Sequence, residues 1–163
     1  VHHVSVRIPV HQAASMIRPY RNSDLEALLG VWYRASLIAH SFLPADFFEV
    51  EKREIAETWL PAAETTVYET DGRVVGFLAL IGNEVGAIFV DPDQQGRGVG
   101  RSLMDHARDS RPFLELSVFE ANTSGRGFYE RYGFEYVGRG INEATGHPEL
   151  RLRLSPGPVR RVG

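Results

Sequence analysis

A glycine-rich turn between an apolar strand and an amphipathic helix is the feature that most constrains this sequence. An apolar run ends at Val90, three glycines follow at Gly96, Gly98 and Gly100, and a helical pattern continues to Arg108. Backbone N–H groups at a helix start have no intrahelical partner, and the helix dipole favours an anion there. Glycines also let a ligand approach the backbone closely. We therefore expect a phosphate-binding junction in a protein that mixes strands and helices.

Two common phosphate-binding motifs do not fit this spacing. A dinucleotide fingerprint, G-x-G-x-x-G, would require glycine where the chain has Arg101 or Leu103. A Walker P-loop would require a lysine in the turn, but the only lysine of the chain is the distant Lys52. The pattern that remains is Gln95-x-x-Gly98-x-Gly100. Taken alone, it is also compatible with a surface turn that binds nothing.

The remaining pattern resembles the acyl-CoA pyrophosphate loop, Q/R-x-x-G-x-G/A, of the GCN5-related N-acetyltransferase (GNAT) family. A second segment resembles the family signature N-x(6)-Y-x-x-x-G-F through Asn122, Tyr129 and Gly133-Phe134. The two segments occur in the family's order, and the resemblance extends from Ile17 to Leu154. It implies an acyltransferase that uses acetyl-CoA as its donor and an amine as its acceptor.

Composition excludes several other classes of protein. The chain has 163 residues, 43% of them hydrophobic and 24% charged, which fits one soluble domain. A net charge of −3 gives no electrostatic reason to expect nucleic acid, and no apolar run reaches the ~18 residues of a membrane span. Cysteine is absent and no H-E-x-x-H pattern occurs, so we expect no metal site. We expect a cytoplasmic enzyme, with a homodimer left open.

The ends of the chain are expected to lie outside the domain. Residues 1–15 read as an upstream or non-native extension, with an extra edge strand from Val4 to Ile8 as the alternative. The N-acetyltransferase domain would span residues 16–155, and a flexible tail would follow over residues 156–163.

Hydrophobic periodicity predicts eleven elements along the domain, in the order strand, two helices, three strands, helix, strand, helix, two strands. These elements are Ile17-Arg18, a helix from a capping box at Ser23 to Ala39, a helix over Ala45 to Leu60, strands over Thr66 to Thr70, Arg73 to Ile81 and Glu84 to Val90, a helix over Gly98 to Arg108, a strand over Phe113 to Val118, a helix over Asn122 to Tyr132, and strands over Glu135 to Gly138 and Glu149 to Leu154. The order matches the GNAT fold. The resemblance thus implies an α/β (α+β) class with a mixed, mostly antiparallel sheet, splayed between strands 4 and 5 and flanked by about four helices.

By the same resemblance, the pantetheine arm of the cofactor lies in the gap between strands 4 and 5. It would pair with the backbone of strand 4 as an added strand does. The alternative is that these strand residues only build the core. The expected cofactor-binding residues are Ile88, Phe89, Val90, Gln95, Gly96, Arg97, Gly98, Val99, Gly100, Arg101, Asn122 and Tyr129.

Acetyl transfer to an amine requires a group that removes a proton, because an alkyl ammonium with a pKa near 10.4 cannot attack. The resemblance makes Glu84, on strand 4, the candidate base. Strand alternation would put Glu84 on the face of Gly86, Ile88 and Val90. A solvated glutamate at a strand start is the alternative.

The departing thiolate needs a proton donor, and the resemblance assigns this role to Tyr129. A phenol with a pKa near 10 stays neutral at pH 7 and can donate to a thiolate. Packing of an aromatic side chain on an amphipathic helix is the alternative. A backbone N–H near Val90 would stabilise the oxyanion. Gly125 and Gly127 depart from the family, and each weakens the helix by roughly 1 kcal/mol relative to alanine, so the first turns are expected to be irregular or to be tightened only by the cofactor.

The resemblance implies that the first two helices and their connection wall the acceptor pocket, with Trp32, His40 and Phe42 as the candidate substrate-binding residues. His40 is also compatible with a purely structural role. The sequence favours direct transfer in a ternary complex to the primary amine of a small molecule. Alternatives are a protein lysine or N-terminal acetyltransferase and a non-catalytic acyl-CoA-binding module.

Overall fold

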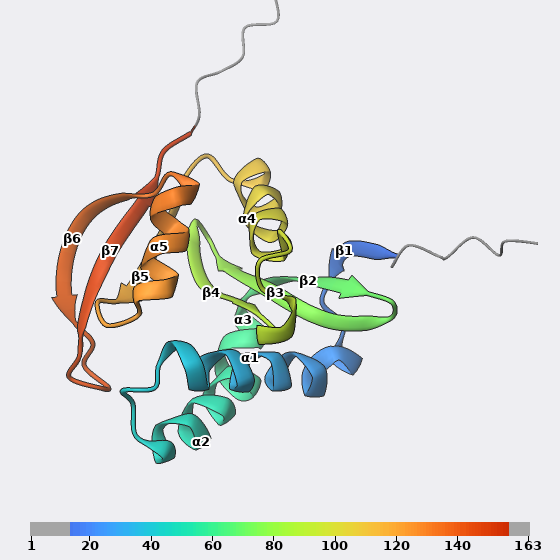
Figure 1. Ribbon diagram of the computed structural model, residues 1–163, viewed down its shortest axis with the longest axis horizontal. Coiled ribbons are helices and arrows are strands. Elements are labelled where there is room, and N and C mark those ends of the chain that lie inside the picture. Colours follow the sequence, from blue (N-terminus) through green and yellow to red (C-terminus); the bar gives the residue numbers. More distant parts are fainter. Residues whose placement is uncertain (1–13, 157–163) are drawn as a thin grey trace, which may run out of the picture.

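The computed structural model describes residues 14–156 as a seven-stranded sheet with helices on both faces (Figure 1). Neighbouring strands are antiparallel except β4 and β5, which are parallel. The predicted mixed, mostly antiparallel sheet is confirmed. The strand order is β1 (Ser15–Pro19), β2 (Glu64–Thr70), β3 (Arg73–Ile81), β4 (Glu84–Val90), β5 (Leu114–Phe119), β7 (Pro148–Leu154) and β6 (Glu135–Ile141).

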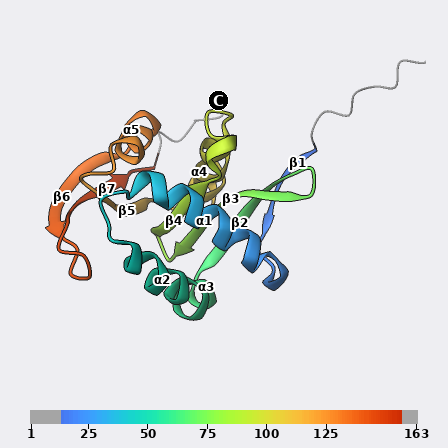
Figure 2. The same cartoon turned by 60° about the horizontal axis from the view of Figure 1, so that its bottom comes forward.

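The helices divide between the two faces of this sheet, as Figures 1 and 2 show from two directions. Helices α1 (Leu25–Ala39) and α2 (Ala45–Glu54) pack with β2 and β3 on one face. Helices α4 (Val99–Ser110) and α5 (Thr123–Tyr132) pack on the other. The remaining helical segments are short: 3-10 turns at Asn22–Asp24 and Pro92–Gln94, a π-helix at Ile55–Trp59 and α3 (Leu60–Ala62).

The first two helices differ in detail from the prediction. A capping box was expected at Ser23, but α1 begins at Leu25, and Asp24 instead accepts a hydrogen bond from the Arg21 N–H at 2.8 Å. Asp24 is also buried against Arg18, with N–O distances of 2.8 and 2.9 Å. The helix that was expected to stop before Pro61 changes at Ile55 to a π-helix and continues to Ala62. Proline, which lacks an N–H, is tolerated in the first turn of a new helix.

The sheet splays where it was expected to. The only pairing between β4 and β5 within residues 14–156 is Glu84 with Glu115, supported by a 2.9 Å hydrogen bond from the Glu115 N–H to the Asn83 carbonyl. Past this point no strand of the described residues pairs with β4 on its β5 side, although β4 pairs with β3 along its length. One backbone edge of β4 therefore faces the gap.

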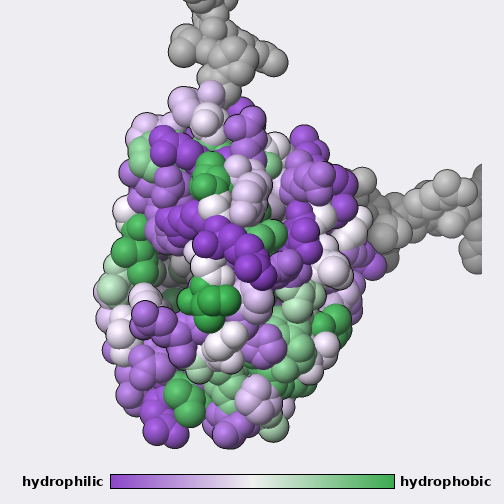
Figure 3. All heavy atoms as spheres, turned by 90° about the vertical axis from the view of Figure 1, so that its left-hand side faces the viewer, coloured by the Kyte–Doolittle hydropathy of each residue, from purple (hydrophilic) through white to green (hydrophobic). Residues whose placement is uncertain are grey.

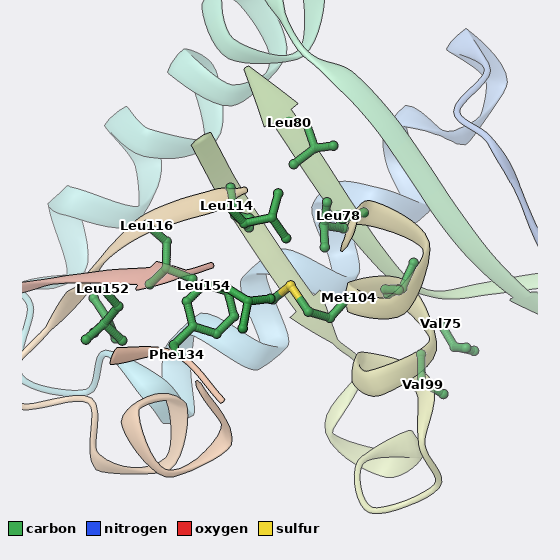
Figure 4. Packing of buried hydrophobic residues seen from close by; sticks show 14 residues of the cluster. Val75, Leu78, Leu80, Val99, Met104, Leu114, Leu116, Phe134, Leu152 and Leu154 are labelled. Atoms are coloured by element: carbon green, nitrogen blue, oxygen red, sulfur yellow. The ribbon is translucent and has the colours of Figure 1, made fainter. Parts of the chain in front are cut away.

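The core closes this gap on one face only. The α4-side cluster joins Leu78 of β3 to Leu116 of β5 and Leu154 of β7, across the splay. Figure 4 shows Met104 of α4 reaching from the β3 side toward Phe134, and Met104 is completely buried. The cluster on the opposite face consists mainly of residues from α1, α2, β2 and β3. The gap is thus filled under α4 and α5 and left open toward α1 and α2.

The sheet ends at β6, which forms an edge strand with three exposed apolar side chains, Tyr136, Val137 and Ile141. Figure 3 views the molecule from this side, where strongly hydrophobic residues form separate small groups among hydrophilic ones. None of the helices in residues 14–156 combines the length and apolar composition needed to cross a membrane. The alternative strand from Val4 to Ile8 lies outside the described residues.

Candidate active site

The glycine-rich junction has the geometry of an anion site. Gly96 and Gly98 adopt left-handed conformations, with φ of 79° and 81°, and α4 begins directly after Gly98. The first backbone bond of the helix runs from the Ser102 N–H to the Gly98 carbonyl at 3.0 Å. Within the described chain, the N–H groups of residues 96–101 have no hydrogen-bond partner. This row of free donors fits a pyrophosphate.

The positive charge and the open surface at the junction also fit a bound pyrophosphate. Arg97 and Arg101 are exposed beside the free amides. A Cβ on Gly96 or Gly98 would meet no atom within 4 Å, so these glycines are needed for their backbone conformation and the surface above them is open. Gln95 fastens the turn to β4, because its Nε2 donates to the Val90 carbonyl at 3.2 Å.

The β4 residues expected to pair with the pantetheine have side chains in the core. Ile88 and Val90 pack on the α4-side cluster, whereas Phe89 packs on the α1 side against Phe77, with 5.7 Å between ring centroids. Their side chains therefore fix β4 in place, while their backbone lies along the edge that faces the gap. This arrangement is compatible with a backbone that pairs with the pantetheine and also with residues that only build the core.

A cleft of about 660 Å³, here called the central cleft, lies on the open side of the gap. It collects residues from α1, α2, the π-helix, β3, β4, β5, α5 and its N-cap, the β6–β7 connection and β7. The central cleft brings together seven of the predicted residues: Trp32, His40, Glu84, Ile88, Phe89, Asn122 and Tyr129. Phe42, Val90 and residues 95–101 do not line it.

A β-bulge places Glu84 on a different face from the one predicted. Ala87 pairs with Ala79, but the next pair is Val85 with Leu80, so Gly86 is an extra residue in β4. The bulge reverses the alternation. Glu84 therefore shares the α1 face with Ala87 and Phe89, not the face of Ile88 and Val90, and the predicted side was wrong. This is the face on which the central cleft opens.

Glu84 is held by Arg151 of β7. The two guanidinium NH2 groups donate to the two carboxylate oxygens at 2.6 and 2.5 Å. Arg151 also donates to Glu115 of β5 at 2.8 Å and to Ser117 at 3.2 Å. The bonds to Glu84 raise the pKa of Arg151 still further, and the bond from Arg151 lowers that of Glu115. This network joins β4, β5 and β7 at the point where the splay begins.

The Tyr129 side chain projects from α5 into the central cleft. Its ring packs edge-on against Phe128 and Phe134, at centroid distances of 5.5 and 5.6 Å. Its hydroxyl has no hydrogen-bond partner among residues 14–156, and desolvation raises its pKa above the ordinary tyrosine value. The hydroxyl is therefore protonated at neutral pH and available as a donor.

Asn122 caps α5. Its Oδ1 accepts hydrogen bonds from the Gly125 N–H at 3.0 Å and the Ser124 hydroxyl at 3.2 Å. A Cβ on Gly125 would lie 2.5 Å from the Asn122 side chain, so this cap requires the glycine that departs from the family pattern. The expected irregular first turns do not occur, because α5 is regular from Thr123.

His40 belongs to an aromatic group between the α1–α2 connection and the ends of β4 and β5. Its ring lies 5.1 Å from Phe119 and 6.0 Å from Phe42, and Phe42 in turn lies 5.5 Å from Phe119. Burial lowers the pKa of His40 to about 4, so the imidazole is neutral at neutral pH. This environment favours the structural role for His40.

Several residues of the central cleft were missed from the sequence. Glu51 of α2 and Trp59 of the π-helix line it, as do Ser36 of α1 and Glu149 of β7. Phe47, Glu51, Ile55 and Trp59 are spaced by four residues, but a regular α-helix turns by about 40° at each such step, so the spacing alone did not place this row on one face. Among the described residues no group of three or more histidine, aspartate or glutamate side chains could hold a metal ion.

Comparison with known proteins agrees with this geometry. The family model "Acetyltransferase (GNAT) domain" matches residues 61–136. The peptidyl-lysine N-acetyltransferase YjaB of Salmonella typhimurium is 37% identical over 139 residues, covering 85% of this chain and 95% of the relative. The peptidyl-lysine N-acetyltransferase YiaC of Escherichia coli is 32% identical and covers 75% of this chain and 84% of the relative.

Solved structures show the same fold. The solution structure of apo YjaB from Escherichia coli aligns with a TM-score of 0.77 at 34% identity, over 86% of this chain and 97% of that one. The PaiA N-acetyltransferase of Thermoplasma acidophilum, solved with coenzyme A, aligns with a TM-score of 0.72 at 18% identity, over 87% of this chain and 99% of that one. By its sequence and its splayed sheet, this chain belongs to the GNAT family of acetyltransferases.

Proposed function

We propose that this enzyme transfers the acetyl group of acetyl-CoA to the side-chain amine of lysine in proteins. The observation that carries the proposal is the continuous path from the free amides of residues 96–101, along the unpartnered edge of β4, to Glu84 and Tyr129 in the central cleft. The lysine acceptor is supported by relatives at 37% and 32% identity that are named peptidyl-lysine N-acetyltransferases.

The donor binds through groups that the sequence pointed to. The amides of residues 96–101, with Arg97 and Arg101, hold the pyrophosphate. The free edge of β4 at Ile88 to Val90 pairs with the amides of the pantetheine arm. Acetyl-CoA supplies an activated thioester, and no metal takes part in the proposed reaction.

Glu84 receives the proton of the acceptor amine. Arg151 occupies one lone pair of each carboxylate oxygen, and each oxygen keeps a second one. Since Glu84 is about one-third exposed and faces the open side of the gap, the proton can reach it directly or through water. Tyr129 donates its O–H toward the departing sulfur, and a β4 backbone N–H near Val90 stabilises the oxyanion.

A small-molecule amine is the second candidate acceptor. The volume of the central cleft, about 660 Å³, lies within the range of small-molecule sites. The cytoplasmic location and the homodimer stay predictions from the sequence.

A coupled assay of CoA release, with mass spectrometry of the products, tests the acceptor. The probes are a peptide with one lysine and a blocked N-terminus, a lysine-free peptide with a free N-terminus, and a polyamine. We expect acetylation of the lysine peptide and little of the others. Acetylation of the polyamine alone would establish the small-molecule acceptor. If none of the three probes leads to CoA release, the result counts against both candidate acceptors.

A further inference from the structure

One face of the second helical segment runs along the central cleft and carries a single charge. Phe47, Glu51, Ile55 and Trp59 all line the cleft at intervals of four residues. In a regular α-helix, each such step turns the side chain by about 40°, so the row would drift away. The wider π-turn at Ile55–Trp59 counters this drift and keeps Trp59 on the cleft side.

The charges around the cleft are unbalanced. Its lining includes the carboxylates of Glu51, Glu84 and Glu149 but no lysine or arginine of the described chain. His40 is neutral, and the charge of Glu84 is matched by its ion pair with Arg151. The carboxylate of Glu51, like that of Glu149, has no ion-pair or hydrogen-bond partner within residues 14–156. An apolar cleft with an unmatched carboxylate favours a cation.

The immediate surroundings of Glu51 strengthen this point. Desolvation, and then repulsion from Glu54, raises the pKa of its carboxyl group, so the ionised form lacks adequate solvation. Ser36 of α1, which also lines the cleft, is only 1% exposed, and its hydroxyl has no hydrogen-bond partner among residues 14–156. Both are polar groups of one cleft that a donor ligand would satisfy.

We propose that Glu51 binds the ammonium group of the incoming acceptor and thereby selects a cation on an aliphatic stem. Phe47, Ile55 and Trp59 pack along the stem, and the Ser36 hydroxyl accepts a further N–H from the acceptor. Glu51 is then a specificity residue that binds the acceptor in its ammonium form as it enters the cleft. The same group has to leave Glu51 and give a proton to Glu84 before it attacks the thioester. This inference rests on the proposed function and defines how the same cleft recognises its acceptor.

The test uses the full chain and a blocked peptide with one lysine. Glu51→Gln should raise the KM for this peptide roughly tenfold to a hundredfold, because hydrogen bonds to a charged group are lost. Its affinity for acetyl-CoA, measured by calorimetry, should stay that of the parent enzyme. Glu49→Gln is the matched control, since Glu49 is exposed on the same helix and does not line the cleft.

A second measurement separates recognition of charge from an effect on structure. Two peptides that cannot be acetylated replace lysine with dimethyl-lysine, which keeps the charge, or with norleucine, which keeps only the stem. The parent enzyme should bind the dimethyl-lysine peptide more tightly, and Glu51→Gln should bind both equally. Glu51→Asp keeps the charge and should retain part of the preference.

The outcomes are distinct. A preference for the charged peptide that survives in Glu51→Gln, or that disappears in Glu149→Gln instead, overturns the role of Glu51 while leaving the proposed function intact. If the parent enzyme acetylates no lysine peptide and does not distinguish the charged peptide from the neutral one, both proposals fail.

Discussion

At the scale of single residues, the surroundings of Tyr129 decide how it can assist the leaving thiolate. A thiol has a pKa near 8.5, whereas desolvation raises the pKa of Tyr129 above 10. Complete proton transfer from this phenol to a thiolate is therefore uphill. A hydrogen bond from the neutral hydroxyl is favourable, and it stabilises negative charge as it develops on sulfur. The raised pKa keeps this donor protonated throughout the neutral range.

Removing this hydroxyl should slow the chemical step. We expect Tyr129→Phe to lower kcat by roughly 100-fold, the lower end of the effect of general acids, with an unchanged Kd for acetyl-CoA. Single-turnover kinetics and calorimetry measure the two quantities. Tyr132→Phe is the control, because the Tyr132 hydroxyl of the same helix bonds to Asp105 at 2.6 Å and does not line the cleft. Equal kcat values in the two variants would leave Tyr129 as a packing residue.

Glu84 and Glu115 share Arg151 but only Glu84 lines the cleft, which makes them a matched pair. We expect Glu84→Gln to lower kcat/KM by roughly 100-fold at pH 7 and by less at higher pH, where more of the amine is already deprotonated. Glu115→Gln should keep the parent profile. The measurement is the pH–rate profile of each variant with a lysine peptide. Parallel profiles for the parent enzyme and Glu84→Gln would rule out Glu84 as the base.

At the scale of elements, the junction between β4 and α4 combines free amides with two left-handed glycines. Gly98→Asp should weaken acetyl-CoA binding by at least tenfold, because it adds a negative charge at an anion site. Gly72→Asp is its control: Gly72 has a similar φ of 76° in the β2–β3 turn, so it carries similar backbone strain away from the junction. Calorimetry should show a loss of affinity only for Gly98→Asp. Similar affinities for acetyl-CoA in both variants would mean that the pyrophosphate does not bind at this junction.

Regular elements were predictable from the sequence, and irregular ones were not. The boundaries of β3 and β4 agree with the expected strands, since their apolar runs end at clear turn residues. The bulge at Gly86 and the π-turn at Ile55–Trp59 carry no such signal, because both depend on how neighbouring elements pack. Each irregularity changes which side chains reach the cleft. The sequence thus indicated Glu84 but not its face, and it did not indicate Glu51.

Contacts between segments that are distant in the chain could not be predicted from the sequence either. The order of elements predicted the splay through the family resemblance, and the structure shows it. The pairing of Glu84 with Arg151 joins residues far apart in the chain, and in the sequence Arg151 stands only as a polar position between Leu150 and Leu152. Motifs of short range located the candidate donor site, whereas the acceptor side depends on long-range packing of α1 and α2.

At the scale of the whole molecule, two halves of a sheet are joined on one face and separated on the other. The α4-side core and the Arg151 network connect them, while the central cleft occupies the open side. Met104 lies in the connecting core and is 0% exposed, so it fixes the position of α4 over both halves. The width of the gap should therefore depend on this core.

Shortening Met104 tests that dependence. Met104→Ala should cost about 2–5 kcal/mol of folding free energy through the cavity it creates, and it should weaken acetyl-CoA binding because the gap loses its fixed width. Val67→Ala is the control, since Val67 is equally buried but belongs to the cluster on the opposite face. Thermal unfolding and calorimetry should show a lower Tm in both variants and a higher Kd in Met104→Ala alone. An unchanged Kd in Met104→Ala would mean that β4 and the glycine junction hold the cofactor without help from the other half of the sheet.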